Sequence, residues 1–170
     1  MRVTDAELLE RALACYKPHC RYLRSAGLDA NGPDPLVVRG RFAIPESCYI
    51  DDTGHLNSVE VNICVNQLLY LALAVVIRDR LAPAFADWTL GGYWERRLSD
   101  VLIGRYAAAF PRPIDAGAFT AELAVRSVRQ RRLRSEAPPL VAVDLAFRCH
   151  DAAGGAAGGT VAVAVVGGPS

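Results

Sequence analysis

The sequence predicts an α+β domain in which an antiparallel sheet wraps round one long central helix. Residues 58 to about 80 are apolar on nearly every face, so a helix there has to be covered on all sides. Four segments with strand character follow, separated by proline and glycine. The 170 residues, 52% of them hydrophobic, are expected to fold as one domain, residues 1–170. An antiparallel sheet curled round the helix is an economical way to bury it.

The segments before the long helix show first a helix pattern and then a strand pattern. Thr4 and Glu7 have the spacing of a capping box, and apolar residues recur at helical spacing as far as Leu13, which predicts a short helix. In residues 35–44 apolar and polar side chains alternate, as in a half-buried strand. Residues 45–57 show no periodicity and are expected to form a loop that enters the long helix.

The rest of the sheet is expected after the long helix. The four strand candidates are residues 101–110, 119–126, 140–149 and 160–166. Glycines in residues 154–159 stand between the last two candidates. We interpret them as a hairpin turn, because a phosphate-binding loop would lead into a helix.

Charge and cysteine content exclude several classes of protein. The formal net charge of +1 gives no long-range attraction to nucleic acid or an anionic membrane, so neither is expected as a partner. The five cysteines are odd in number and form no Cys-x-x-Cys pair, which favours a reducing cytoplasm. Residues 61–77 are short for a membrane span and contain three amide side chains, which favours a buried helix. No metal-ligand pattern is present, and no metal is expected.

Polar side chains gather in residues 46–70, which read ESCYIDDTGHLNSVEVNICVNQLLY. They crowd the entrance and one flank of the apolar helix. Burying Asn66 or Gln67 without a partner would cost about 1 to 3 kcal/mol each. These amides therefore need hydrogen-bond partners or a substrate.

This stretch resembles the FcoT-like thioesterases, a family with the hot-dog fold. The family pattern joins a Glu-Ser-x-Tyr-Ile segment, a Thr-Gly-His-x-Asn loop and an Asn-Gln pair on the central helix. The matching residues are Glu46, Ser47, Tyr49 and Ile50; Thr53, Gly54, His55 and Asn57; Asn66 and Gln67. The resemblance extends to Tyr16, to Cys20, Arg21 and Tyr22, and to a strand with Leu98, Ser99, Leu102 and Ile103.

The resemblance implies catalytic roles for Tyr16, Tyr49 and Asn66, carried over position by position. It also implies a homodimer or higher homo-oligomer, because relatives pair their sheets edge to edge and build the acyl tunnel at the subunit boundary. The family lacks the carboxylate nucleophile of many other hot-dog thioesterases. Asp51 stands four residues before His55, a spacing similar to the motif of those other enzymes, and lies outside the FcoT-like pattern.

The residues themselves agree with chemistry on a thioester. A carbonyl at the start of a helix meets unpaired backbone N–H groups and the positive end of the macrodipole. The expected substrate-binding residues are Gly54, Asn57, Ser58 and, behind them, Gln67. His55 can take a proton near neutral pH and joins the catalytic candidates.

Two reactions suit such a site. Attack of water on the carbonyl gives hydrolysis, whereas polarising the carbonyl of an α,β-unsaturated thioester lets an amine add at the β-carbon. The resemblance implies the second reaction, since some relatives add glycine to an enoyl thioester and hydrolysis then frees an N-carboxymethyl-3-amino acid. The expected carrier is the phosphopantetheine of acyl carrier protein or CoA, with no other cofactor. Simple acyl thioester hydrolysis, enoyl hydration and noncatalytic acyl binding remain alternatives.

Structural roles compete with the chemical ones. Tyr49 suits a core tyrosine, and Asn66 suits a structural hydrogen bond inside the helix. His55 and Asn57 suit a turn and a helix cap. Glu60 suits a first-turn residue facing the helix dipole better than a general base.

The dense basic run also has two interpretations. It consists of Arg126, Arg129, Arg131, Arg132 and Arg134. A solvated strand edge is the simpler one. The other is a docking surface for the acidic helix of a carrier protein, because arginines match carboxylate and phosphate geometry.

Overall fold

A computed structural model describes residues 2–3, 5–29, 36–132 and 139–167. It contains one seven-stranded antiparallel sheet in the order β1-β2-β3-β5-β6-β7-β4. The strands are β1 (Arg2–Val3), β2 (Leu23–Asp29), β3 (Val37–Phe42), β4 (Val101–Arg112), β5 (Phe119–Arg131), β6 (Leu140–His150) and β7 (Ala156–Val165). The helices are α1 (Ala6–Leu13), α2 (Ser58–Arg78) and α3 (Leu90–Asp100), with short 3₁₀ turns at Pro18–Cys20 and Pro83–Phe85.

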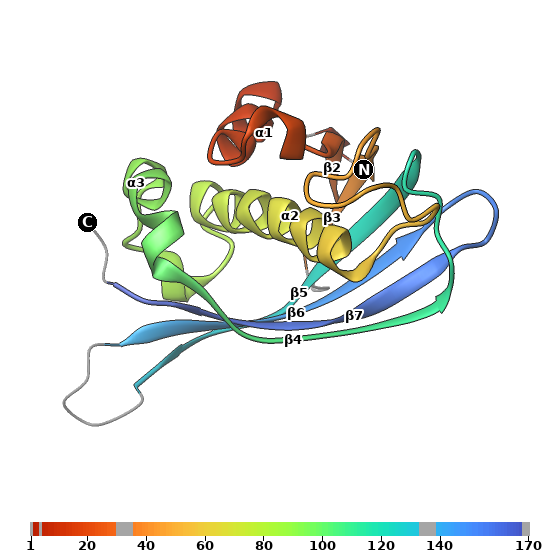
Figure 1. The fold of residues 1–170 in the computed structure, drawn as a ribbon. Coiled ribbons are helices and arrows are strands. Elements are labelled where there is room, and N and C mark those ends of the chain that lie inside the picture. The colour runs from red at the N-terminus through yellow and green to blue at the C-terminus, as the bar shows by residue number, and fades with distance from the viewer. Residues whose placement is uncertain (1, 4, 30–35, 133–138, 168–170) are drawn as a thin grey trace.

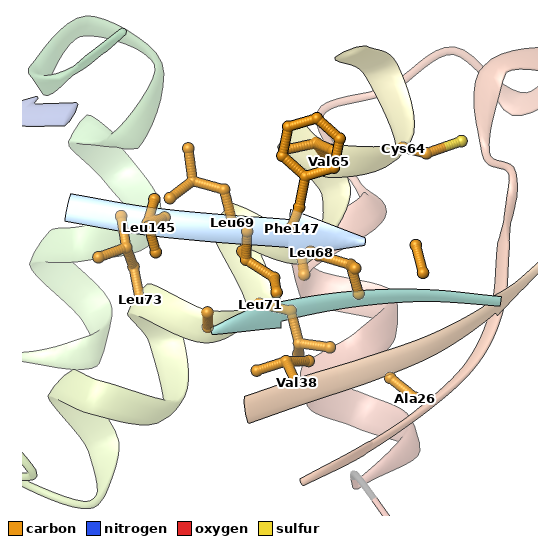
Figure 2. Close-up of a cluster of buried hydrophobic side chains, with 14 of the residues drawn as sticks. Ala26, Val38, Cys64, Val65, Leu68, Leu69, Leu71, Leu73, Leu145 and Phe147 are labelled. Carbon is orange, nitrogen blue, oxygen red and sulfur yellow. The ribbon is translucent and has the colours of Figure 1, made fainter. Parts of the chain in front are cut away.

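The sheet curves round α2, and all three helices lie on its concave side (Figure 1). This confirms the predicted α+β hot-dog fold, with an antiparallel sheet wrapped round a long central helix. Leu68 and Leu71 of α2 lie in one buried cluster with Val38, Leu145 and Phe147 from the sheet (Figure 2). Helices α1 and α3 pack against the remaining flanks of α2.

Most apolar side chains of α2 are buried in this core. Among the described residues, α2 is the one helix long and apolar enough to cross a membrane, and 78% of its most apolar stretch is buried inside the fold. The prediction of a buried helix is therefore confirmed.

Strand β2 and helix α3 are among the elements that were not predicted from the sequence. Strand β2 lacks a clean alternation because its register with β3 shifts between Leu23 and Ser25. Helix α3 includes Leu98 and Ser99, which we expected in a strand; the strand starts only at Val101. Thr89 caps α3 by accepting a hydrogen bond from the Gly92 N–H at 3.1 Å, a cap signal that the sequence analysis missed.

Two local predictions were wrong in detail. The N-cap of α1 is Asp5, whose carboxylate accepts the Glu7 N–H at 2.9 Å, and Thr4 lies outside the described residues. Gly159 lies within β7 rather than in the turn before it. A Cβ at this position would collide with the backbone carbonyl of Ala107 in β4, so the close approach of two strands explains the glycine.

Candidate active site at the start of the central helix

Asn57 begins α2 with a capping box. Its Oδ1 accepts hydrogen bonds from the N–H groups of Val59 and Glu60, both at 3.0 Å, while Glu60 Oε2 accepts the Asn57 N–H at 3.5 Å. The Val61 N–H donates to the Asn57 carbonyl. Within the described residues, the first-turn donor left for a substrate oxygen is therefore the N–H of Ser58.

Tyr49 stands over this cap with an exposed ring rather than in the core. Its hydroxyl donates a 2.8 Å hydrogen bond to Asn57 Oδ1, which is the third bond to an oxygen with two lone pairs. The tyrosine bond can thus be exchanged for one to a substrate without uncapping the helix. Partial desolvation and the negative charge of Glu60 raise the pKa of Tyr49, so the phenol stays protonated and able to donate.

The loop before the cap is held by short-range hydrogen bonds. Thr53 Oγ1 donates to the His55 carbonyl at 2.7 Å, and the Gly54 N–H donates to Asp52 Oδ1 at 2.8 Å. Gly54 has φ of +75°, which favours glycine. The His55 ring is exposed on this loop, with Nδ1 3.5 Å from Thr53 Oγ1. His55 and Gly54 therefore lie at the mouth of the helix, as the sequence indicated.

A cavity of about 410 Å³ opens beside the same loop and the first turn of α2. Its lining residues are Ile44, Pro45, Glu46, Ser47, Ile50, Asp51, Asp52, Thr53, Gly54, Glu60, Asp115, Ala116 and Gly117. Five of them carry carboxylates, and none is lysine or arginine. Tyr49, His55 and Asn66 are not in its wall. The sequence analysis missed Asp115 as a site residue because the connection between β4 and β5 brings it here from far along the chain.

Farther along α2, Gln67 has a structural role. Its Oε1 accepts the N–H groups of Tyr22 and Leu23 at 3.2 and 2.9 Å, and its Nε2 donates to the Cys20 carbonyl at 2.6 Å. The side chain is fully buried. All its polar atoms thus hold the segment that enters β2, and none is free for a substrate.

Asn66 takes no part in this contact. Its Oδ1, like that of Asn62, is buried without a hydrogen-bond partner among the described residues, so it is able to accept a hydrogen bond from a ligand. Tyr70, one turn later on the same helix face, lies with its ring centroid 6.1 Å from that of Tyr16. Burial first, and then the neighbouring Tyr70, raises the pKa of Tyr16.

The predicted catalytic residues, together with the predicted substrate-binding residue Asn57, therefore form two groups in one chain. Tyr49, His55 and Asn57 lie at the start of α2, whereas Asn66 and Tyr16 lie deeper. Asn66 lies nine positions after Asn57, which is roughly 13 Å along a helix axis. A site that uses both groups therefore has to be elongated and to run along α2, a shape that suits an acyl chain.

The basic run lies at the far end of β5. Phe119 pairs with Phe42 just before the site loop, and Arg129 follows ten residues later, roughly 33 Å along the strand. Arg129 pairs with Asp144 at 2.7 Å. Arg126, Arg131 and Arg132 are exposed, and Arg134 lies outside the described residues. Within one chain the run is thus remote from the mouth of α2.

Asp151 ties one wall of the cavity to the β6–β7 turn. Its carboxylate accepts the N–H groups of Asp115, Ala153 and Gly155 at 2.7, 2.9 and 2.7 Å. These donors, led by that of Asp115, lower the pKa of Asp151. The carboxylate therefore stabilises the fold above the ordinary aspartate pKa near 3.9, and this contribution is lost as pH falls through the lower folded-state pKa.

We expect Asp151→Asn to be less stable than the parent protein at pH 7, with the gap closing below about pH 4 as the parent carboxylate takes its proton. Thermal unfolding of both proteins from pH 7 to pH 3 measures this. Asp87→Asn, at an exposed aspartate, is the matched control and should follow the parent protein throughout. A gap that stays constant over this range would contradict the assignment.

Comparison with known proteins identifies the family of this chain. A family model described as the FcoT-like thioesterase domain matches residues 11–165. A (2E)-enoyl-[ACP] glycyltransferase from Streptomyces coeruleorubidus is 46% identical over 165 residues, covering 96% of this chain and 98% of that protein. One from Mycobacterium marinum is 36% identical over 163 residues, covering 94% and 85%.

A solved structure of a thioesterase candidate from Shewanella oneidensis has a similar fold, with a TM-score of 0.52, 10% identity and coverage of 96% of this chain and all of that one. Fold and relatives together define an enzyme with a thioesterase-type hot-dog fold. The chain belongs to the FcoT-like thioesterase domain family.

Proposed function

We propose that this enzyme adds glycine to the β-carbon of an α,β-unsaturated acyl thioester on acyl carrier protein and then hydrolyses the thioester, releasing an N-carboxymethyl-3-amino acid. The observation that carries the proposal is the 46% identity to a (2E)-enoyl-[ACP] glycyltransferase over nearly the full length of both chains. The residues Tyr16, Tyr49 and Asn66, which the family resemblance marks as catalytic, are all present. Simple hydrolysis of acyl-carrier or CoA thioesters is the alternative.

The mouth of α2 supports a role in carbonyl activation. The Ser58 N–H and the Tyr49 hydroxyl can both donate to the thioester oxygen, and the helix dipole favours negative charge there. Withdrawing electrons through the carbonyl makes the β-carbon of an enoyl group electrophilic, and the same donors stabilise the tetrahedral intermediate of hydrolysis. Asn66 and Tyr16 then line the path of the acyl chain, with the buried Asn66 Oδ1 as one polar contact.

The test is to incubate the enzyme with a crotonyl-loaded or longer enoyl-loaded carrier protein, with and without glycine, and to weigh the products. An acid that contains glycine supports the proposal. Free enoic acid without any glycine-containing product would indicate that the enzyme only hydrolyses the thioester. A 3-hydroxyacyl product still on the carrier would indicate hydration, and an unchanged thioester that raises the melting temperature would indicate acyl binding.

The proposal includes the setting of the reaction. The substrate arrives on the phosphopantetheine of a carrier protein, with CoA as the other possible carrier, and the enzyme needs no cofactor of its own. We place the reaction in the cytoplasm, with no nucleic-acid or membrane partner. Carrier docking on the arginine run stays a prediction; because that run is remote from α2 in its own chain, docking there would have to serve the site of another subunit.

A homodimer belongs to the same proposal. Strand β4 ends the sheet, and its residues are exposed along almost its whole length, including Leu102, Ile103 and Phe110. A long apolar edge strand with free backbone groups is a surface that pairs with another strand. Pairing of two β4 edges would join the sheets and cover these side chains.

We expect Ile103→Lys to convert the dimer into a monomer, because a charge on an edge strand opposes strand pairing. Light scattering coupled to gel filtration measures the mass. The control is Leu98→Lys, which changes an exposed leucine on α3 and should leave the mass unchanged. A parent protein that runs as a monomer would refute the dimer.

A further inference from the structure

We infer that Glu60 accepts the proton of the amine co-substrate, which enters the acidic cavity beside the first turn of α2. The inference rests on the proposed glycine addition and assigns a step in it that the family pattern leaves without a residue. An ammonium group is not a nucleophile, so one proton has to leave glycine before its nitrogen can attack. The group that takes this proton has to lie beside the activated thioester.

Glu60 is a buried carboxylate with spare hydrogen-bonding capacity. It is 2% exposed, and its hydrogen bond from the Asn57 N–H is long, at 3.5 Å, and reaches only Oε2. Within the described residues, Oε1 accepts no hydrogen bond. The capping bond uses Oε2 alone, so Oε1 is able to accept a further hydrogen bond. A donor that enters the cavity would supply the missing bond, because Glu60 forms part of the cavity wall.

Ser47 provides a second, independent sign of a ligand. Its Oγ is buried, has no hydrogen-bond partner among the described residues, and belongs to the same cavity wall. Buried hydroxyls are normally hydrogen-bonded. An unsatisfied buried hydroxyl and a carboxylate oxygen able to accept a further hydrogen bond thus line one small cavity, which points to a small polar molecule between them.

The charge of the cavity selects a cation. Glu46, Asp51, Asp52 and Asp115 join Glu60 in its wall, without a lysine or arginine. In the part of the chain that the structure describes, no three His, Cys, Asp or Glu side chains gather closely enough to hold a metal ion. Dispersed carboxylates suit an ammonium group, which donates in several directions.

Glu60 is also close to the group that we assign to carbonyl activation. The Tyr49 hydroxyl and the Glu60 N–H both donate to Asn57 Oδ1, at 2.8 and 3.0 Å, so the two residues are neighbours, and the charge of Glu60 contributes to the raised pKa of Tyr49. The proton acceptor and the donor to the thioester oxygen are therefore both hydrogen-bonded to the Asn57 cap at the mouth of α2. We place the enoyl group across this cap, with its oxygen at Tyr49 and its β-carbon toward the cavity at Glu60.

The proton and electron balance is complete without another reagent. Glu60 takes one proton from the glycine ammonium, and the freed nitrogen pair forms the N–Cβ bond. The C=C pair moves to give an enolate whose oxygen is stabilised by Tyr49 and Ser58. The proton on Glu60 passes to the α-carbon, which restores the carboxylate and leaves a secondary ammonium in the product.

The test compares two nucleophiles on Glu60→Gln. Glutamine keeps the capping box, so the fold should persist. Addition of glycine at pH 7 should fall by about 100-fold or more, the scale of a lost general base. Addition of aminooxyacetate, whose nitrogen is already neutral at this pH, should stay close to the parent rate after correction for the enzyme-free reaction. Glu10→Gln, at an exposed glutamate of α1, is the matched control and should change neither rate.

A second variant separates the proton transfer from the fold. Glu60→Asp keeps a carboxylate and should recover part of the glycine rate that Glu60→Gln loses. Equal losses for both nucleophiles, or an aspartate variant no better than the glutamine variant, would overturn the role of Glu60 while the parent enzyme still adds glycine. A parent enzyme that adds neither nucleophile would refute the proposed function itself, and the inference with it.

Discussion

Replacing Gln67 with leucine is expected to lower the free energy of unfolding by about 3 kcal/mol or more, since each of three backbone groups left buried without a partner costs about 1 to 3 kcal/mol. Gln67 bonds three such groups, the N–H of Tyr22, the N–H of Leu23 and the carbonyl of Cys20. Leucine fills a similar volume but offers none of these bonds. The segment that leads from α1 into β2 would lose its attachment to α2.

Urea unfolding followed by circular dichroism measures this loss. Gln130→Leu is the matched control, because Gln130 is the other glutamine of the chain and lies exposed on β5. A surface change of this kind should stay within about 0.5 kcal/mol. Equal stability of the two variants would show that the Gln67 bonds contribute nothing.

Tyr49→Phe is expected to lower kcat for thioester turnover by about 10² to 10³, the usual effect of removing one donor to a developing oxyanion. The fold should be little affected, because the hydroxyl is exposed and Asn57 Oδ1 keeps its two backbone donors. Release of product from an enoyl-loaded carrier measures the rate, with the melting temperature determined alongside.

Tyr106→Phe is the control for this change. Tyr106 has a buried hydroxyl without a partner in the described part of the chain, and its ring stacks on Phe147 with centroids 5.6 Å apart. Phenylalanine keeps the stacking, so activity should persist and stability should not fall. If Tyr49→Phe had the same kcat as Tyr106→Phe, the hydroxyl of Tyr49 would have no role in catalysis, and the residue would only support the loop.

Some residues of the candidate site could be predicted from local sequence patterns, and others could not. Tyr49, His55 and Asn57 stand in a short segment before the helix, where local spacing alone places them beside the first turn. Glu60 was interpreted as a first-turn residue, and the capping box confirms that role. Its burial in a cavity wall was not predicted, because the helix pattern is the same whether that turn faces solvent or another loop.

For Gln67 and Asp115, the sequence could not predict which distant residues they would meet in the fold. The sequence indicated that a buried Gln67 needs partners and left open whether they were substrate or protein. The partners are protein backbone groups at the entrance to β2. This strand was not predicted, because its irregular register interrupts the alternation of apolar and polar residues. In the sequence, Asp115 has the features of an ordinary loop residue. In the structure, the β4–β5 connection places it in the same cavity wall as residues of the loop before α2.

The sequence by itself determined the central helix, the class of fold and the family, because an all-round apolar helix and a dense local motif are properties of neighbouring residues. Only the tertiary structure decided which polar groups are satisfied and which are left for a ligand. Hydrogen bonds to Gln67 and the cavity at Glu60 join residues distant in the chain, and their geometry exists only after the sheet has closed round α2.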